Sequence, residues 1–133
     1  MWIYNLVPFT ADQTEGYYGF VYIIRNNLTN KSYIGRKYFS KASTKQIKGK
    51  RKKIRKPSDW ENYWSSSDEL KNDIKKFGKE NFTRIILHLC KTRATCSYME
   101  TWEIFKNKCL LSDDWYNSWC SCKIHKSHVK GKL

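Results

Sequence analysis

The chain has 133 residues and a formal net charge of +14 at neutral pH, with 26 Lys and Arg residues against 12 Asp and Glu residues. This length predicts one domain over residues 1–133, with a modest core. The positive excess favours a polyanionic partner, foremost nucleic acid and less so lipid headgroups or acidic protein. The sequence contains no apolar run of membrane-spanning length and no basic leading segment of a secretory signal. We therefore expect a cytoplasmic protein without a membrane partner, whose five cysteines are reduced thiols, core residues or metal ligands.

The first part of the chain predicts a β-hairpin that follows an N-terminal arm or short strand over residues 1–16. Residues 18–25 are mostly aromatic and β-branched, which is typical of a strand. The polar run NNLTNK predicts a turn, and residues 32–39 predict the return strand. Because side chains alternate along a strand, Tyr22 and Tyr33 are expected to lie near each other across the hairpin.

A strongly basic insertion follows at about residues 41–57. Its central run KQIKGKRKKIRK holds eight Lys or Arg residues in twelve and no acidic residue. We interpret it as a mobile loop that ends at Pro57. A solvated surface is one explanation, but so many uncompensated charges favour contact with the phosphates of DNA. The residues predicted to make these contacts are Lys45, Lys48, Lys50, Arg51, Lys52, Lys53, Arg55 and Lys56.

The next residues predict a helix and then a strand. Ser66 and Glu69 have capping-box spacing, and the apolar residues that follow repeat at helical intervals until Gly78. Residues 81–90, NFTRIILHLC, are apolar enough for a central strand. His88 within it is interpreted as an ordinary strand residue.

A second helix is predicted at about residues 95–108, with Tyr98, Trp102 and Phe105 along its apolar stripe. The order of hairpin, helix, strand and helix predicts an α+β fold with a small three-stranded antiparallel sheet flanked by helices.

The segment FVYIIRNNLTNKSYIG, residues 20–35, resembles the signature of the GIY-YIG nuclease family, in which a turn joins two short strand motifs. Tyr33-Ile34-Gly35 matches the second motif, and Val21-Tyr22 stands where the family has Ile-Tyr. Phe20 occupies the place of the family's first Gly, and Gly19 lies one position early. Downstream, SSSDELKNDIKKFGKENFTRIIL resembles the family's middle helix and third strand, METWEIF its metal-binding helix, and Tyr116-Asn117 its closing pair. The resemblance covers roughly residues 19–117.

The resemblance implies a metal-dependent DNA endonuclease that hydrolyses phosphodiester bonds, with a phage or homing type as one option. Because one small site would have to cut both strands of a duplex, we expect either a dimer or a monomer that nicks successively on DNA. It assigns Mg²⁺, or Mn²⁺, to Glu100, with phosphate oxygens and water completing the coordination. It makes Tyr22 the general base, provided that nearby Arg, Lys and metal lower its pKa from about 10. Tyr33 would orient water or phosphate, and Asn117 would brace the site.

The catalytic arginine of the family has no clean counterpart, because the basic insertion follows the second motif directly. Arg36 or Lys37 is the first choice, with Arg51 and Arg55 behind, since an Arg offers phosphate a permanent charge and a matching fork.

Other interpretations stay open for these residues. Tyr22 and Tyr33 are also explained as packed strand aromatics. Glu100 lies opposite the apolar stripe of its helix, where a solvated surface Glu is the default, and Glu103 is the fallback ligand. For the whole chain, the alternative is a non-catalytic nucleic-acid-binding protein with a degenerate nuclease fold.

The tail at about residues 112–133 is irregular and lies mostly outside the resemblance. Its spacing Cys120-x-Cys122-x2-His125-x2-His128 supplies four ligands of the type that zinc prefers. A structural Zn²⁺ in a small binding module is one interpretation. The other is that the histidines contact phosphate or that the tail is disordered.

Overall fold

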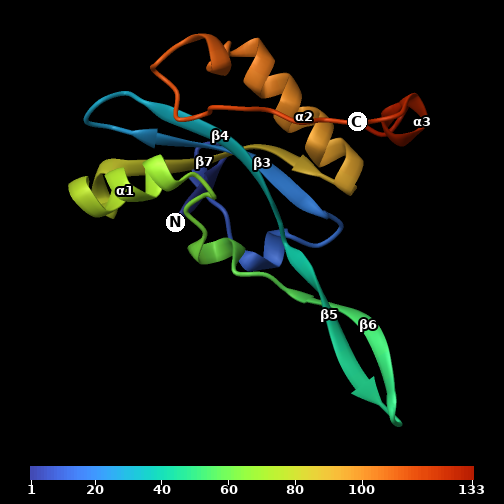
Figure 1. The fold of residues 1–133 in the computed structure, drawn as a ribbon. Helices are drawn as coiled ribbons and strands as arrows, with labels where there is room; N and C mark the ends of the chain where they lie inside the picture. Colours follow the sequence, from blue (N-terminus) through green and yellow to red (C-terminus); the bar gives the residue numbers. More distant parts are fainter.

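The computed structural model describes residues 1–133 as an α+β fold built on a five-stranded sheet with the strand order β2-β1-β7-β3-β4 (Figure 1). A separate two-stranded ribbon, β5-β6, extends from it. None of the helices combines the length and the apolar character that crossing a bilayer would need. The strands are β1 Trp2–Tyr4, β2 Val7–Pro8, β3 Gly19–Asn26, β4 Ser32–Tyr38, β5 Ser40–Ile47, β6 Lys50–Pro57 and β7 Phe82–Cys90, and the helices are α1 Asp68–Phe77, α2 Arg93–Lys106 and α3 Lys126–Val129.

The predicted hairpin and the predicted central strand are confirmed. β3 pairs antiparallel with both β4 and β7, and β7 lies in the middle of the sheet. The prediction of a three-stranded antiparallel sheet was wrong, because β1 adds to β7 in parallel and β2 adds to β1. These two strands have only three and two residues, which is too short for a period of two to be recognised.

Each face of the sheet buries its own core. Leu70 and Ile74 of α1 pack on one face against aromatic residues that include Phe20 and Tyr22. On the other face α2 brings Cys96 and Ile104 against Val21, Ile34 and Cys90. Figure 1 shows the two helices on opposite sides of the strands. The strand residues alternate between the two cores. β4 lies at the edge of the sheet, where α2 packs beside it.

The first helix begins and ends almost where its sequence predicts. Its N-cap is Ser67 rather than Ser66, because the Ser67 hydroxyl accepts the hydrogen bond from the Leu70 amide at 3.3 Å. Gly78 ends the helix with a positive φ of 91°, a conformation that suits glycine.

The buried face of α2 differs from the predicted apolar stripe. Tyr98, Trp102 and Phe105 are 39%, 43% and 63% exposed. The helix instead buries the face that carries Thr95, Cys96, Glu103 and Ile104. Cys96 on this face approaches β3 closely, since a Cβ at Gly19 of β3 would lie only 3.1 Å from Cys96 Sγ.

The basic insertion forms the ribbon β5-β6, so the prediction of a loop was wrong. Its strands pair antiparallel from Ser40↔Pro57 to Ile47↔Lys50. The two residues between them, Lys48 and Gly49, have φ values of 51° and 75°. Positive φ at both central positions matches the twist that joins two strands in a tight hairpin. Figure 1 shows the ribbon extending away from the rest of the chain.

Candidate active site

A cleft of about 840 Å³ lies beside the edge strand β4, between the start of α1, the middle of α2 and the tail. Segments from four parts of the sequence therefore meet there. Its lining includes Tyr22, Tyr33, Ile34, Arg36, Ser66, Ser67, Asp68, Glu69, Glu100, Ile104, Tyr116, Asn117, Ser118, Trp119, Cys120 and Ser121.

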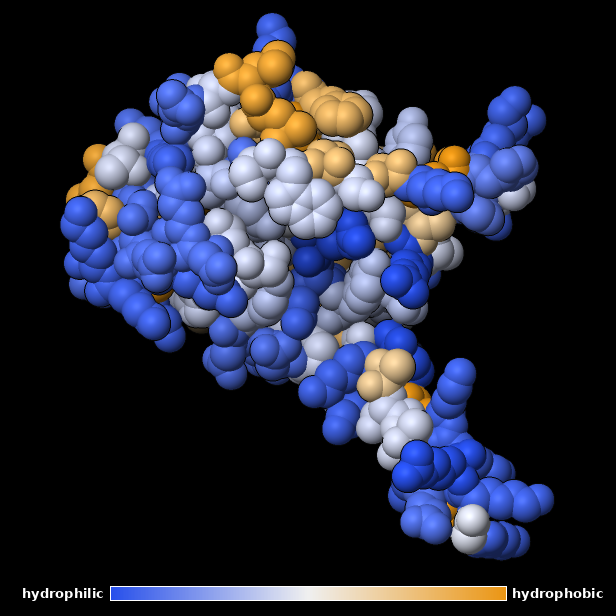
Figure 2. Space-filling model, in the orientation of Figure 1, coloured by the Kyte–Doolittle hydropathy of each residue, from blue (hydrophilic) through white to orange (hydrophobic).

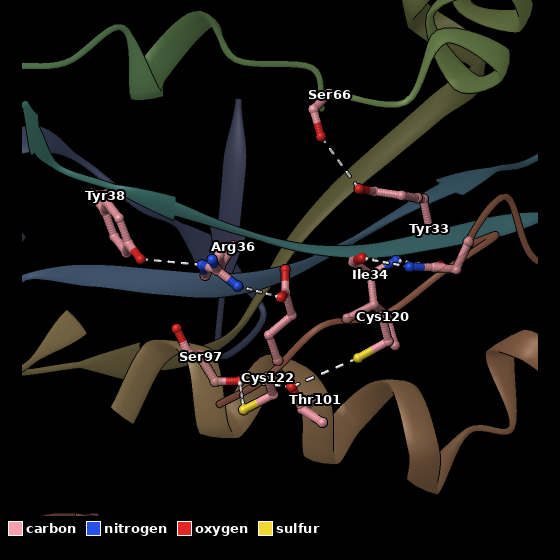
Figure 3. Close-up of polar contacts among 11 residues, drawn as sticks. Tyr33, Ile34, Arg36, Tyr38, Ser66, Ser97, Thr101, Cys120 and Cys122 are labelled. Carbon is pink, nitrogen blue, oxygen red and sulfur yellow. Dashed lines mark hydrogen bonds and ion pairs between the residues drawn. The ribbon is translucent and has the colours of Figure 1, made fainter. Parts of the chain in front are cut away.

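Tyr22 and Tyr33 lie side by side in this cleft, as the hairpin spacing predicts, with their ring centroids 6.2 Å apart. Tyr22 reaches the cleft over Gly35, its direct partner on β4. A Cβ at position 35 would come against the Tyr22 hydroxyl and lie 2.6 Å from Tyr22 Cζ. The absence of a side chain at Gly35 therefore leaves the space that the Tyr22 ring occupies. The Tyr33 hydroxyl lies 3.5 Å from Ser66 Oγ (Figure 3).

Burial is the main cause that raises the pKa of both tyrosines, and neighbouring phenols add to it. Tyr22 is only 1% exposed, and burial followed by Tyr63 and Tyr33 raises its pKa well above 10. Burial likewise raises the pKa of Tyr33, and the opposing effects of Ser66 and Arg36 are smaller. Both hydroxyls therefore carry their protons at neutral pH and can donate hydrogen bonds to an anion.

Arg36 and Glu100 form an ion pair in the cleft. Arg36 Nη1 donates to Glu100 Oε1 at 2.6 Å, and Arg36 Nε donates to the Tyr38 hydroxyl at 3.1 Å (Figure 3). The two charged side chains are 33% and 16% exposed, so both remain accessible to a ligand. The pair joins β4 to α2 across the floor of the cleft.

The electrostatics of this pair are set by partial burial. Burial raises the pKa of Glu100 above its ordinary value, and the attraction of Arg36 offsets this only in part. For Arg36, burial lowers the pKa, but the carboxylate of Glu100 and the Tyr38 hydroxyl outweigh it and raise the pKa overall. A carboxylate held this way would gain from a further cation, because its single cationic neighbour does not offset its lost hydration.

Glu103, the fallback ligand, lies away from the cleft. It is 6% exposed, accepts a hydrogen bond from Asn107 and lies 2.8 Å from His88 Nε2. His88 thus pairs with a carboxylate, which the sequence interpretation as an ordinary strand residue did not include.

Asn117 and Tyr116 tie the tail to the hairpin. Asn117 Oδ1 accepts from the Ile34 amide at 3.0 Å, and its Nδ2 donates to the Ile34 carbonyl at 2.8 Å. The Tyr116 hydroxyl accepts from Asn26 Nδ2 at 3.2 Å and donates to Asp73 Oδ2 at 2.7 Å. Burial and Asp73 raise the pKa of Tyr116 to about 12. These contacts fix the position of the outer edge of β4, the strand that carries Tyr33 and Arg36.

The remaining candidates for the catalytic cation lie outside the cleft. Lys37 points to the other face of β4, where its Nζ lies 2.7 Å from Asp59 and 4.1 Å from the centre of the Tyr63 ring. Arg55 donates to the Ser40 carbonyl at 2.8 Å at the base of the ribbon, and Arg51 lies near its tip. Arg36 is therefore the candidate that the fold brings to Glu100.

The structure does not bring the four candidate zinc ligands of the tail together. Cys120 Sγ contacts Thr101 of α2, and Cys122 Sγ contacts the Ser97 carbonyl of the same helix (Figure 3). His125 and His128 lie together at the short helix α3, with His128 Nδ1 accepting from the His125 amide. No group of three or more His, Cys, Asp or Glu side chains is placed to hold a metal ion. All five cysteines are free thiols.

The cleft contains residues that sequence reasoning did not assign to it. Ser66, Asp68 and Glu69 come from the start of α1, where their only signal was a helix cap. Trp119 stands at the cleft with 74% of its surface exposed. Nothing in the local sequence indicates this position, because the tail reaches the cleft through the Asn117 contacts.

A known protein family matches most of this chain. The sequence profile of the family described as "Putative endonuclease segE, GIY-YIG domain" matches residues 2–120. The chain therefore belongs to this GIY-YIG endonuclease family and carries a nuclease domain. Searches of curated proteins and of solved structures found no match.

Proposed function

We propose that the chain is a Mg²⁺-dependent endonuclease that hydrolyses phosphodiester bonds of DNA in the cleft beside β4, with Mn²⁺ as an alternative metal. The observation that carries the proposal is the Arg36–Glu100 pair, which lies 2.6 Å apart beside the hydroxyls of Tyr22 and Tyr33. A cation, a carboxylate and two proton donors in one cleft are the groups that phosphodiester hydrolysis uses.

The residues present fit a bound Mg²⁺. This ion usually binds one or two protein carboxylates and completes its coordination with water and phosphate oxygens, so it does not need a cluster of protein ligands. Glu100 supplies one partly buried carboxylate whose lost hydration favours a cation beside it. When bound, the ion would stabilise negative charge on the phosphate and activate water.

The other side chains take defined roles in the proposal. The Arg36 guanidinium neutralises a phosphate oxygen, because its fork and permanent charge match that group. Tyr22 and Tyr33 stay protonated and donate hydrogen bonds that orient the phosphate or the attacking water, which replaces the expected general-base role of Tyr22. Asn117 holds the main chain of Ile34 and so positions the strand that carries Tyr33 and Arg36.

The ribbon β5-β6 serves in this proposal as the contact to the DNA backbone. Its Lys and Arg side chains are exposed, and residues 40–57 contain no Asp or Glu. Figure 2 shows mostly hydrophilic side chains along the ribbon. On duplex DNA we propose either successive nicks by a monomer or paired cuts by a dimer. A phage or homing-type role, suggested by family resemblance, predicts a few discrete fragments from a long DNA rather than a smear.

A plasmid-nicking assay tests the function. The parent chain should convert supercoiled plasmid to nicked circles with Mg²⁺ and should be inactive in EDTA. Glu100→Gln keeps the size of the side chain but loses its charge, so nicking should fall by about 10²-fold or more while DNA affinity stays near that of the parent. Glu15→Ala, at an exposed acidic residue that does not line the cleft, is the matched control and should nick normally.

Three outcomes would count against the proposal. Equal nicking in EDTA would show that the reaction needs no metal ion. Full activity of Glu100→Gln would show that the Glu100 carboxylate has no catalytic role. DNA binding by the parent chain without any nicking would favour the alternative of a non-catalytic nucleic-acid-binding protein.

A further inference from the structure

The ribbon β5-β6 is longer than a connection between β4 and α1 requires. Eight residues in each strand, at ~3.3 Å per residue, give it a reach of about 26 Å. Figure 1 shows the ribbon projecting from one end of β4, and Figure 2 shows mostly hydrophilic side chains along it.

The ribbon is poorly suited to stand alone in water. Lys41 lies directly opposite Lys56, and Lys45 lies directly opposite Lys52. Like charges in this arrangement destabilise an antiparallel pair, and an isolated two-stranded ribbon is marginally stable at best. Residues 40–57 contain no Asp or Glu that could relieve the repulsion. A polyanion around the ribbon would remove both problems together.

The two faces of the ribbon differ in their side chains. Cross-strand partners share a face and successive residues alternate, so the Lys41/Lys56 and Lys45/Lys52 pairs lie on one face. The other face carries the pairs Thr44/Lys53 and Gln46/Arg51. Lysine is a flexible point charge, whereas Arg and Gln offer paired hydrogen-bonding groups at fixed spacing. One face therefore suits phosphates and the other suits base edges.

We infer that the ribbon enters the major groove of duplex DNA and reads sequence there through Gln46 and Arg51. A major groove about 12 Å wide admits a two-stranded β-ribbon. There Arg binds the O6 and N7 atoms of guanine in a bidentate manner, and Gln binds the N6 and N7 atoms of adenine. Because Gln46 and Arg51 are direct cross-strand partners, the bases that they read lie close together. The inference rests on the proposed function for its substrate, duplex DNA.

The base of the ribbon couples this reading to the cleft. β5 follows β4 with only Phe39 between them, and Arg36 lines the same surface hollow as Lys41 and Arg55 at the foot of the ribbon. Ser58 Oγ donates to the Tyr38 carbonyl at 2.6 Å, and the Arg55 guanidinium lies 5.3 Å from the centre of the Tyr18 ring. These contacts fix the distance between the base-reading residues, Gln46 and Arg51, and the cleft. At ~3.4 Å per base pair, the bases read should lie within about 8 base pairs of the cut.

Selection of bound duplexes from a random-sequence library tests the inference. The full chain is incubated with the library in EDTA, and bound, uncut duplexes are recovered and sequenced. The parent should enrich a guanine and a nearby adenine. Arg51→Lys keeps the charge but loses the fork, and Gln46→Ala removes an uncharged amide. Each variant should lose about 5- to 150-fold of discrimination at one position and leave the salt dependence of binding unchanged.

The opposite face supplies the matched control. Lys45→Ala with Lys52→Ala should weaken binding to all sequences alike and reduce the slope of log K against log salt by about 0.9 for each phosphate that is no longer neutralised. The parental base preference should survive in this control. No enrichment by the parent, an unchanged preference in both Arg51→Lys and Gln46→Ala, or equal loss of preference in the lysine control would overturn the inference. The selection needs no cleavage, so failure of the nuclease proposal would leave its result intact.

Discussion

Replacing Gly35 by alanine should force Tyr22 out of its position in the cleft. The added Cβ would come against the Tyr22 hydroxyl, 2.6 Å from Tyr22 Cζ and 2.9 Å from Tyr33 Cε1. These distances are too short for carbon atoms in contact, so a side chain or the strand must move. Tyr22 has little room, because its ring is 1% exposed and packs against Trp2 and Phe20.

The size of the effect follows from packing energies. Overpacking a filled core by one methyl group costs about 1–3 kcal/mol. An unfolding entropy of about 2.1 cal/mol/K per residue, over a chain of 133 residues, converts this to a fall in melting temperature of ~4–11 °C. A displacement of about 1 Å at a reacting group costs up to ~10²-fold in rate, so nicking at 20 °C should fall by ~10- to 100-fold while the chain is still folded.

Thermal denaturation followed by circular dichroism and initial rates of plasmid nicking measure the two effects. Gly35→Ala in a Tyr22→Phe background is the informative control. Removing the hydroxyl relieves the closest contact, so the double variant should lose less stability than the sum of the two single losses. The relief should be partial, because the Cζ and Tyr33 contacts remain. A melting temperature within about 1 °C of the parent and a parental nicking rate in Gly35→Ala would refute the reasoning.

Three further predictions concern single groups. Burial raises the pKa of Glu100 above 4.5, so protonation of this carboxyl stabilises the fold, and that stability is lost as pH rises through the folded pKa. The nicking rate should rise through the same pKa, because the charged carboxylate is the active form. An acid limb centred at or below 4.5 in the pH–rate profile would contradict this. Tyr22→Phe removes one hydrogen-bond donor to the reacting phosphate, so nicking should fall by about 10²-fold with a nearly unchanged melting temperature, whereas parental activity would assign Tyr22 a packing role. Arg84 lies between the rings of Trp2 and Trp64 and donates to two main-chain carbonyls, so Arg84→Met should lower the free energy of unfolding by about 2–4 kcal/mol in urea denaturation. An unchanged urea midpoint would show that these contacts contribute little.

The sequence pattern was sufficient to predict those elements whose contacts lie within the element or with its neighbour in the chain. Alternation along residues 18–39 identified β3 and β4. The spacing of Tyr22 and Tyr33 placed them together, because strands joined by a short turn lie side by side. The helix that ends at Gly78 was recognisable for the same reason, since its cap and its apolar repeat are local. The composition likewise identified the basic insertion, although not its shape.

Tertiary structure decided which surfaces meet. Periodicity shows that α2 has an apolar stripe at Tyr98 and Trp102, but the helix buries the face with Cys96, whose small side chain fits the close approach to Gly19. That rotation brings Glu100 to Arg36, a pair separated by 64 residues that no local pattern predicts. The shape of the basic insertion also depends on contacts that its composition does not show, since its charges predict a solvated loop. The structure forms two strands instead, which pair across the Lys48-Gly49 turn and are anchored at their base by contacts of Arg55 with Tyr18. The composition determined the strong positive charge of the chain, and long-range packing determined which side chains line the cleft.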